Sequence, residues 1–377
     1  MILMKPHAGG MDAKRLQRID DWMVRWVENS HLPNLLVAIQ RKGRLVYLRH
    51  TGPRDVEADL PVEEDTLYRI FSMTKPVTTT AAMMLYEEAK FRLDDPVAEF
   101  LPAFHRQEVF AGGNESNYCT EPVQRPVTIR DLMVHTSGLT YGFHNETAVD
   151  ALYRKHEVDF NFRRAPRLLS ELCDQLAEMP LLFQPGSRWN YGVSTDVLGR
   201  LVEVWSGMSL DTFFEERIFK PLGMTDTVFW INDTRMERFG PVYRPNRNGI
   251  LQPHQIELVP FTEQPTLKEG GVGLVSTVPD YLQFAQMFLN NGTWNGQQIL
   301  RPATVALMTT NRLPPSVLPI GFGSSQPGRG WGLGFCVVMD TTDFPYPVNQ
   351  GTYWWDGSSG TRFFIDPVYD MVTVIMA

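Results

Sequence analysis

Strand-like segments occur at both ends of this chain, and helix-like segments fill the stretch between them. Near the N-terminus, residues 34–52 read as two strands joined by a turn at Lys42-Gly43. After about residue 250 the pattern returns to strands, with one long helix at 279–291 among them. The strand-like segments of this second part are 271–277, 331–340, 352–357, 361–367 and 371–377. This order predicts an α/β protein in which the first and last segments share one sheet.

The middle of the chain has helical character. Apolar residues recur at helical spacing in three runs, which Pro- and Gly-rich loops separate: residues 128–139, 167–179 and 194–219. Another amphipathic helix is predicted over 12–30. We therefore expect an α/β domain of residues 1–80 and 251–377, a helical domain of residues 81–250, and an active site in the cleft between them.

Composition excludes several classes of partner. The 377 residues carry a net charge of −8, which disfavours binding to nucleic acid or to an anionic membrane surface. No segment is long and apolar enough to span a membrane, and the N-terminus lacks the apolar run of a signal peptide. The three cysteines, Cys119, Cys173 and Cys336, are too few and too scattered for a disulfide framework. We expect a cytoplasmic protein, and the sequence does not indicate its oligomeric state.

The printed sequence ends on the apolar strand-like segment 371–377. A buried strand normally leads into another element, so we expect further residues to follow it in the native chain.

Ser72 and Lys75 are the first candidates for chemistry. They follow an apolar, strand-like segment and open a helix that is apolar nearly all round, which indicates a buried helix. Residues three apart share one face of a helix, and the helix N-terminus favours developing negative charge. Burial lowers the pKa of a lysine, so that neutral amine near pH 7 can activate a serine hydroxyl. The alternative reading, from this pair alone, is an N-cap serine with a solvated lysine.

Two further stretches, "FQPGSRWNYGVSTDVLGRLVE" and "GTYWWDGSSGTRFFIDP", add weight to the catalytic reading. Together with Ser72-Met73-Thr74-Lys75, they resemble the serine β-lactamase and penicillin-binding protein superfamily, and more closely its class C-like esterases, the family VIII carboxylesterases. The resemblance covers nearly the whole chain. It implies a β-lactamase/DD-peptidase-like fold: a central antiparallel sheet flanked by helices, with a mostly helical second domain and no metal or cofactor.

The resemblance also implies roles for individual residues. Ser72 would be acylated, Lys75 would belong to the proton-transfer network, and Tyr191 would act as general base and acid. A nearby lysine cation would lower the pKa of the Tyr191 phenol enough for it to serve as a base. The backbone N–H groups of Ser72 and Ser358 would form the oxyanion hole, with Gly357 letting the substrate approach the strand.

The substrate-binding positions depart from the lactamase pattern. Val193 stands where lactamases have an asparagine, and Trp355 stands where they have a lysine that meets the substrate carboxylate. Both changes favour a neutral ester over an anionic penicillin. Asp356 would add a carboxylate beside the site and repel anionic substrates. Several aromatic residues of nearby loops suit an apolar acyl or alcohol group: Tyr141, Phe143, Trp354 and Trp355.

These observations predict a serine carboxylesterase that hydrolyses small-molecule short-chain esters through an acyl-enzyme on Ser72. Alternatives on the same fold are a β-lactamase, a D-amino-acid peptidase or an acyltransferase. An alternative of another class is a binding domain without turnover. The chain lacks a G-x-S-x-G motif, a zinc-ligand cluster and a nucleotide-binding loop. His135, Ser137 and Ser359 are interpreted as structural rather than catalytic.

Overall fold

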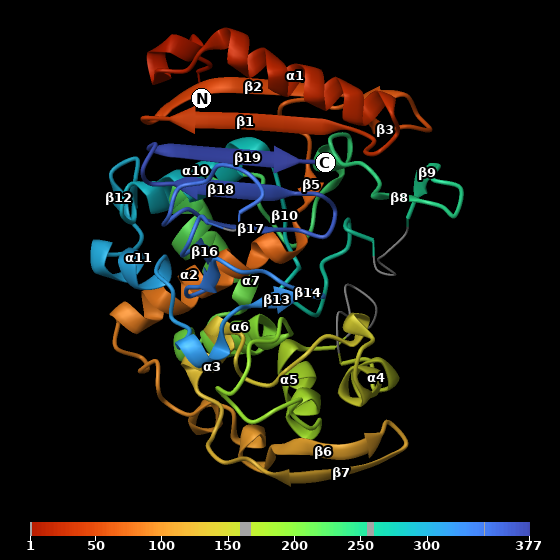
Figure 1. Ribbon diagram of the computed structural model, residues 1–377, viewed down its shortest axis with the longest axis vertical. Helices are drawn as coiled ribbons and strands as arrows, with labels where there is room; N and C mark the ends of the chain where they lie inside the picture. Colours follow the sequence, from red (N-terminus) through yellow and green to blue (C-terminus); the bar gives the residue numbers. More distant parts are fainter. Residues whose placement is uncertain (1, 159–166, 255–259, 343) are drawn as a thin grey trace.

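The computed structural model describes residues 2–158, 167–254, 260–342 and 344–377. Seven strands form one antiparallel sheet in the order β15-β16-β17-β18-β19-β1-β2 (Figure 1). The N-terminal strands are β1 (Leu35–Arg41) and β2 (Arg44–Thr51). The C-terminal strands are β15 (Arg329–Trp331), β16 (Cys336–Val338), β17 (Tyr353–Asp356), β18 (Arg362–Asp366) and β19 (Met371–Met376). Because β19 pairs with β1, the prediction that the two ends of the chain share one sheet is confirmed.

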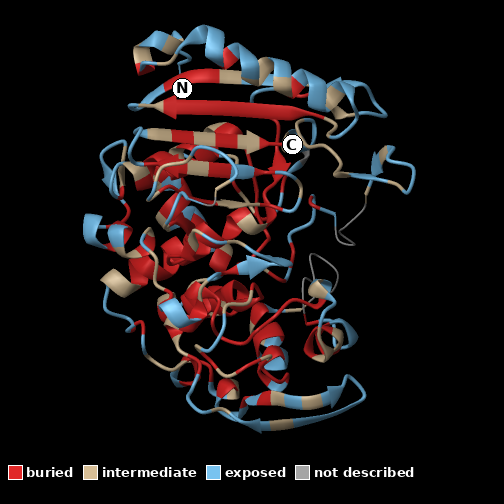
Figure 2. Cartoon of the chain, in the orientation of Figure 1, coloured by how far each residue is buried: buried red, intermediate tan, exposed pale blue. Residues whose placement is uncertain are grey.

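The N-terminal hairpin follows the sequence pattern closely. Lys42 and Gly43 both have positive φ, 53° and 67°, as the turn of a two-residue hairpin requires. Helix α1 (Ala13–Glu28) covers the outer face of this hairpin, and its start is capped by the Asp12 side chain. Its inward residues join a small apolar core, while its outer side is exposed (Figure 2).

The inner face of the sheet packs on two helices that form the main core. Helix α10 (Val278–Leu289) lies against β1, β18 and β19. Helix α2 (Thr74–Glu87) lies deeper, and every residue from Thr74 to Leu85 is buried. The near-complete burial of α2 confirms the expectation drawn from its apolar sequence.

The middle of the chain forms helices below the sheet in the view of Figure 1. They include α3 (Ile129–Val134), α4 (Ala148–Lys155), α5 (Leu169–Glu178), α6 (Ser194–Ser206) and α7 (Leu210–Phe214), with a π-helical turn at Glu215–Phe219. Helix α6 packs directly on α2. The domain boundaries at residues 80 and 250 stay a prediction.

Three local expectations need correction. Segment 271–277 supplies only the short strand β10 (Val275–Ser276), which pairs with β5 (Tyr68–Arg69) outside the main sheet. Segment 331–340 contains a turn between β15 and β16 rather than one continuous strand. A hairpin of β6 (Glu108–Asn114) and β7 (Asn117–Pro122) interrupts the helical region, where no strand was predicted.

Shorter elements complete the described chain. The helices are α8 (Lys220–Leu222), α9 (Asp233–Met236) and α11 (Pro302–Met308). The strands are β3 (Pro53–Asp55), β4 (Leu60–Pro61), β8 (Tyr243–Pro245), β9 (Leu251–Pro253), β11 (Thr293–Trp294), β12 (Gln297–Gln298), β13 (Gly321–Phe322) and β14 (Ser324–Ser325). All three cysteines are free thiols. In the described parts of the chain, every helix is too short or too polar to cross a membrane.

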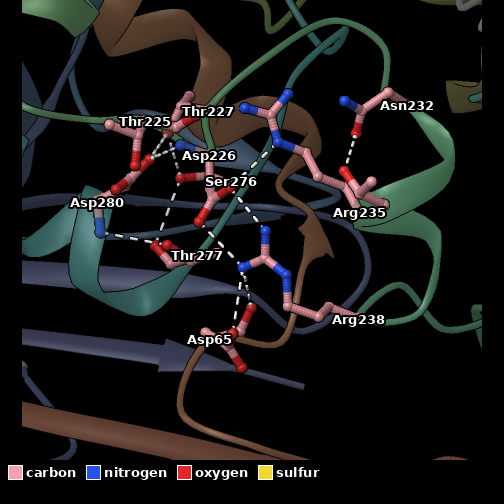
Figure 3. Close-up of polar contacts among 11 residues, drawn as sticks. Asp65, Thr225, Asp226, Thr227, Asn232, Arg235, Arg238, Ser276, Thr277 and Asp280 are labelled. Atoms are coloured by element: carbon pink, nitrogen blue, oxygen red, sulfur yellow. Dashed lines mark hydrogen bonds and ion pairs between the residues drawn. The ribbon is translucent and has the colours of Figure 1, made fainter.

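A polar network fastens the segment after α8 to the start of α10 (Figure 3). The Arg238 guanidinium donates to both carboxylate oxygens of Asp226, at 3.0 and 2.7 Å. Asp280 at the start of α10 accepts from the Asp226 backbone N–H at 2.8 Å and from the Thr227 hydroxyl at 2.9 Å. Thr227 in turn contacts Ser276 of β10, so the network supports the strand pair that precedes Ser72.

Candidate active site

Ser72 and Lys75 lie side by side where the chain enters α2. Ser72 belongs to the short 3₁₀ turn η2 (Phe71–Met73), and α2 follows at Thr74. The Lys75 Nζ lies 3.2 Å from the Ser72 Oγ, within hydrogen-bonding distance. Lys75 is only 1% exposed, whereas Ser72 keeps partial contact with solvent. The hydroxyl is therefore reachable, while the amine beside it is shielded from water.

The backbone immediately before Ser72 is held in an unusual conformation. Phe71 has a φ of 41°, in the left-handed region that bulky side chains rarely adopt. The turn between β17 and β18 supports it, because the Ser359 hydroxyl donates to the Arg69 carbonyl at 2.9 Å. On the other side, the Tyr281 hydroxyl donates to the Met73 carbonyl at 2.9 Å. Strained backbone that its surroundings hold in place is typical of functional sites.

Opposing effects set the charge of Lys75. Burial is the largest and lowers the pKa of the amine to about 7, while the negative charges of Asp196 and Glu269 act to raise it. The amine also donates to the Tyr141 hydroxyl and to the Gly271 carbonyl, each at 3.0 Å. The expectation that burial supplies neutral amine near pH 7 agrees with this environment.

Tyr191 lies against the same two residues. A side-chain hydrogen bond joins it to Ser72, and the Trp355 indole N–H donates to its hydroxyl at 3.1 Å. Lys75 Nζ lies 4.7 Å from the centre of its ring. Burial nevertheless raises the pKa of Tyr191, outweighing the two hydrogen bonds that lower it. This direction is opposite to the expectation that the lysine lowers the pKa of the phenol, because the cost of burying a phenolate outweighs the groups that favour it.

The third motif borders the site at the end of β17. Gly357 admits no side chain, because a Cβ there would lie 2.4 Å from the Ile70 carbonyl oxygen and 2.3 Å from the Thr361 Oγ1. Within the described chain, the N–H of the following Ser358 makes no backbone hydrogen bond, and the residue is exposed. This N–H is free to bind a substrate oxygen, as the oxyanion-hole hypothesis requires.

Two other predicted binding positions behave differently from expectation. Asp356 accepts a hydrogen bond from the Arg362 guanidinium at 2.6 Å, so its charge is balanced and the expected repulsion of anions is weakened. Val193 is only 2% exposed and packs in the main apolar core, so it does not present a surface to a substrate as expected.

The residues interpreted as structural are fully engaged or enclosed. Ser137 shares a hydrogen bond of 2.8 Å with the Ser194 hydroxyl. His135 is buried among the rings of Trp189, Tyr191 and Trp331, and burial holds its pKa well below the ordinary value. The hydrogen bond from His135 to the loop before Tyr191 is made by its backbone carbonyl, which accepts from the Asn190 N–H at 2.9 Å, and not by its imidazole ring.

Sequence reasoning missed the residues that surround Lys75 from other elements. Tyr141 was named only as a loop aromatic, although its hydroxyl contacts the amine. Asp196 on α6 is 3% exposed and accepts from the Gly271 N–H at 2.8 Å. Glu269 is 4% exposed. The sequence offered little signal for Asp196, because an acid in the first turn of a helix is ordinary and its burial only becomes visible in the structure.

A search against family models matches the β-lactamase family over residues 19–377. The chain belongs to this family. The uncharacterized protein MT1414 of Mycobacterium tuberculosis is 34% identical over 350 residues, which cover 92% of this chain and 85% of MT1414. Esterase EstB of Burkholderia gladioli is 29% identical over 385 residues, covering 99% of this chain and 93% of EstB.

The solved structures confirm the β-lactamase fold. EstCE1, described as a hydrolase with promiscuous acyltransferase activity, superposes with a TM-score of 0.83 at 28% identity, covering 96% of this chain and 93% of EstCE1. The predicted family and fold class are thus confirmed. At this coarser level the chain is a serine hydrolase or acyltransferase of the β-lactamase fold.

Proposed function

We propose that this protein is a serine carboxylesterase of the family VIII type, which hydrolyses short-chain carboxylic esters through an acyl-enzyme on Ser72. One observation carries the proposal: Lys75, with its pKa lowered to about 7, lies 3.2 Å from the Ser72 Oγ. At neutral pH a substantial share of this amine is uncharged and able to accept a proton. A binding domain without turnover would not need so strongly perturbed a lysine at this place.

In the proposed acylation, the Lys75 amine takes the proton from Ser72 as its Oγ attacks the ester carbonyl carbon. The backbone N–H groups of Ser72 and Ser358 stabilise the negative oxygen of the tetrahedral intermediate. Tyr191, held neutral by burial, donates its proton to the alcohol oxygen as the C–O bond breaks, and recovers one from the Lys75 ammonium. Water then attacks the acyl-enzyme, and the same groups act in reverse.

An ester fits this site better than a penicillin. The β17 position that would pair with a substrate carboxylate holds Trp355, whose indole N–H is already engaged with Tyr191. The neighbouring residue, Asp356, is itself an anion, and the Arg362 guanidinium next to it is already paired with that carboxylate. The esterase EstB, a similar protein, supports the same choice.

Acyl transfer to an alcohol is the second candidate function. The description of EstCE1 names both hydrolase and acyltransferase activity, and EstCE1 superposes over 96% of this chain. The two functions share the acylation step and differ only in whether water or an alcohol attacks the acyl-enzyme.

Intact-protein mass spectrometry with an aryl fluorophosphonate tests the proposal. We expect one adduct on wild type, none on Ser72→Ala, and unchanged labelling of Ser137→Ala. A panel of short-chain esters, with nitrocefin as a lactam, then separates esterase from β-lactamase, and added methanol reports acyl transfer. Absence of any wild-type adduct and of ester turnover would contradict the proposal and favour the binding-domain alternative.

We also propose a cytoplasmic location, which the free thiols Cys119, Cys173 and Cys336 support. Fractionation of the native host cells tests it. The proposed domain division at residues 80 and 250 is tested by limited proteolysis, which should cut first near residue 250, in the exposed turn between β8 and β9, because residue 80 is buried inside α2.

A further inference from the structure

Two half-exposed phenylalanines stand together at the mouth of the site. Phe143 belongs to η5 (Gly142–His144) and is 49% exposed, while Phe322 belongs to β13 and is 45% exposed. Their ring centres lie 6.3 Å apart, although the two residues come from distant parts of the chain. Exposed apolar side chains that gather at one place, rather than singly, indicate a binding surface.

Both rings are continuous with the proposed proton-transfer network. Phe143 stacks on Tyr141 with ring centres 4.8 Å apart, and Tyr141 accepts a hydrogen bond from Lys75. Phe322 meets Tyr191 edge-on at 5.6 Å. His144 fixes the geometry, because its Nε2 lies 2.7 Å from the Tyr191 carbonyl oxygen and its ring lies 5.3 Å from that of Phe322.

We propose that Phe143 and Phe322 form a wall that binds the alcohol part of the ester and selects alcohols bearing an apolar ring. This inference rests on the proposed function, in which Tyr191 protonates the leaving alcohol. The alcohol oxygen must then lie near the Tyr191 hydroxyl, so its substituent extends along the neighbouring Phe322 and Phe143 rings. On this proposal the wall contacts the alcohol part and not the acyl group on Ser72, which is what the acid panel below tests.

The exposed halves of the two rings set the size of the effect. Aromatic side chains present roughly 150–250 Å² of surface, and about half of each ring remains available to a ligand. A ligand that covers about half of that exposed surface removes roughly 50 Å² of apolar area per ring from water, which is worth about tenfold in affinity. Both rings are already partly exposed, so their truncation leaves the core intact.

Two matched ester panels test the inference. The first holds the acetyl group constant and varies a primary alcohol: ethanol, cyclohexylmethanol and 2-(1-naphthyl)ethanol, whose oxygens have similar leaving ability. The second holds ethanol constant and varies the acid from acetic to cyclohexylacetic. Wild type, Phe143→Ala and Phe322→Ala are compared with Tyr118→Ala, which removes an aromatic of 40% exposure on the distant hairpin of β6 and β7.

We expect each phenylalanine variant to lose about tenfold in kcat/KM for the ring-bearing acetates. The ratio of kcat/KM for the ring-bearing acetates to kcat/KM for ethyl acetate should therefore fall about tenfold, and the ratio within the acid panel should stay constant. Equal losses on every ester, or losses confined to the ring-bearing acid, would overturn the inference. Fluorophosphonate labelling distinguishes failure of this inference from failure of the proposed function. If all variants are fully labelled and their selectivity is unchanged, only the proposed alcohol-binding wall is rejected. If wild type is not labelled, the proposed function itself is rejected.

Discussion

The Lys75 Nζ lies 3.2 Å from the Ser72 Oγ, at the start of a helix in which every residue from Thr74 to Leu85 is buried. Burial makes the ammonium form costly, and the nearby carboxylates Asp196 and Glu269 partly restore it. The pKa of about 7 is thus a balance between desolvation and charge, and each side of that balance is accessible to mutation.

The pH dependence of ester hydrolysis should reflect this balance. Because the neutral amine is the proposed base, kcat/KM should be low in acid and rise tenfold per pH unit toward a plateau above about pH 7. Asp196→Asn removes a charge that raises the pKa of Lys75, so the acidic limb should move to lower pH. Steady-state rates from pH 5 to 9 measure both effects.

Asp94→Asn is the control for this shift, since Asp94 lies on the surface, paired with Arg130. Its pH profile should match that of wild type. A limb that stays in place in Asp196→Asn would show that another group, not Lys75, sets the pH dependence.

Substitutions of Lys75 and of its hydrogen-bond partner Tyr141 distinguish the proposed base from a residue that only positions it. Lys75→Met keeps the length of the side chain and removes the amine, and we expect a loss of about 10³-fold in kcat/KM. Tyr141→Phe removes only one hydrogen bond to that amine, so a loss of about fivefold is expected. Ester assays measure both, with circular dichroism to verify folding. Similar losses in the two variants would mean that Tyr141 takes part directly in proton transfer.

Gly357→Ala tests the proposed oxyanion hole. The added Cβ would collide with the Ile70 carbonyl oxygen at 2.4 Å, and the turn that carries Ser358 would have to move. We expect kcat to fall by about 10²-fold with a smaller change in KM, because the oxyanion interaction is made mainly in the transition state. Ser359→Ala, which removes one hydrogen bond to Arg69, should cost much less. A change confined to KM would place Gly357 in ground-state binding instead.

Local patterns predicted much of the fold. The turn at Lys42-Gly43, the α1 helix and the strands β17, β18 and β19 follow from hydrophobic periodicity and turn residues alone. The hairpin of β6 and β7 was missed because it is largely exposed and has little apolar alternation. Segment 271–277 was predicted to be one strand, but only Val275–Ser276 forms one. Its glycines have no side chains to pack, which weakens a strand.

The motif residues were predictable, but their environment was not. Ser72 and Lys75 are neighbours along one helix, so spacing alone places them together. Asp196, Glu269 and Tyr141 reach Lys75 only through the packing of α2 against α6 and the adjoining loops. The state of Tyr191 was misjudged for the same reason, because the cost of burying a phenolate depends on surroundings that the sequence does not display.

The ion pair of Asp226 and Arg238 offers a test of stability away from the site (Figure 3). Both side chains are 23% exposed, and Arg238 holds the pKa of Asp226 below its usual range. Asp226→Asn should lower the free energy of unfolding by about 2 kcal/mol at pH 7. The ionised carboxylate is the stabilising form, so this difference should be full above about pH 4 and vanish as the pH falls further. Urea unfolding at several pH values measures it.

Asp94→Asn is the matched control. It breaks a similar pair with Arg130, in which the aspartate is 76% exposed, and should cost less than about 1 kcal/mol. Equal costs for the two variants would contradict a larger stabilising role for the less exposed pair of Asp226 and Arg238.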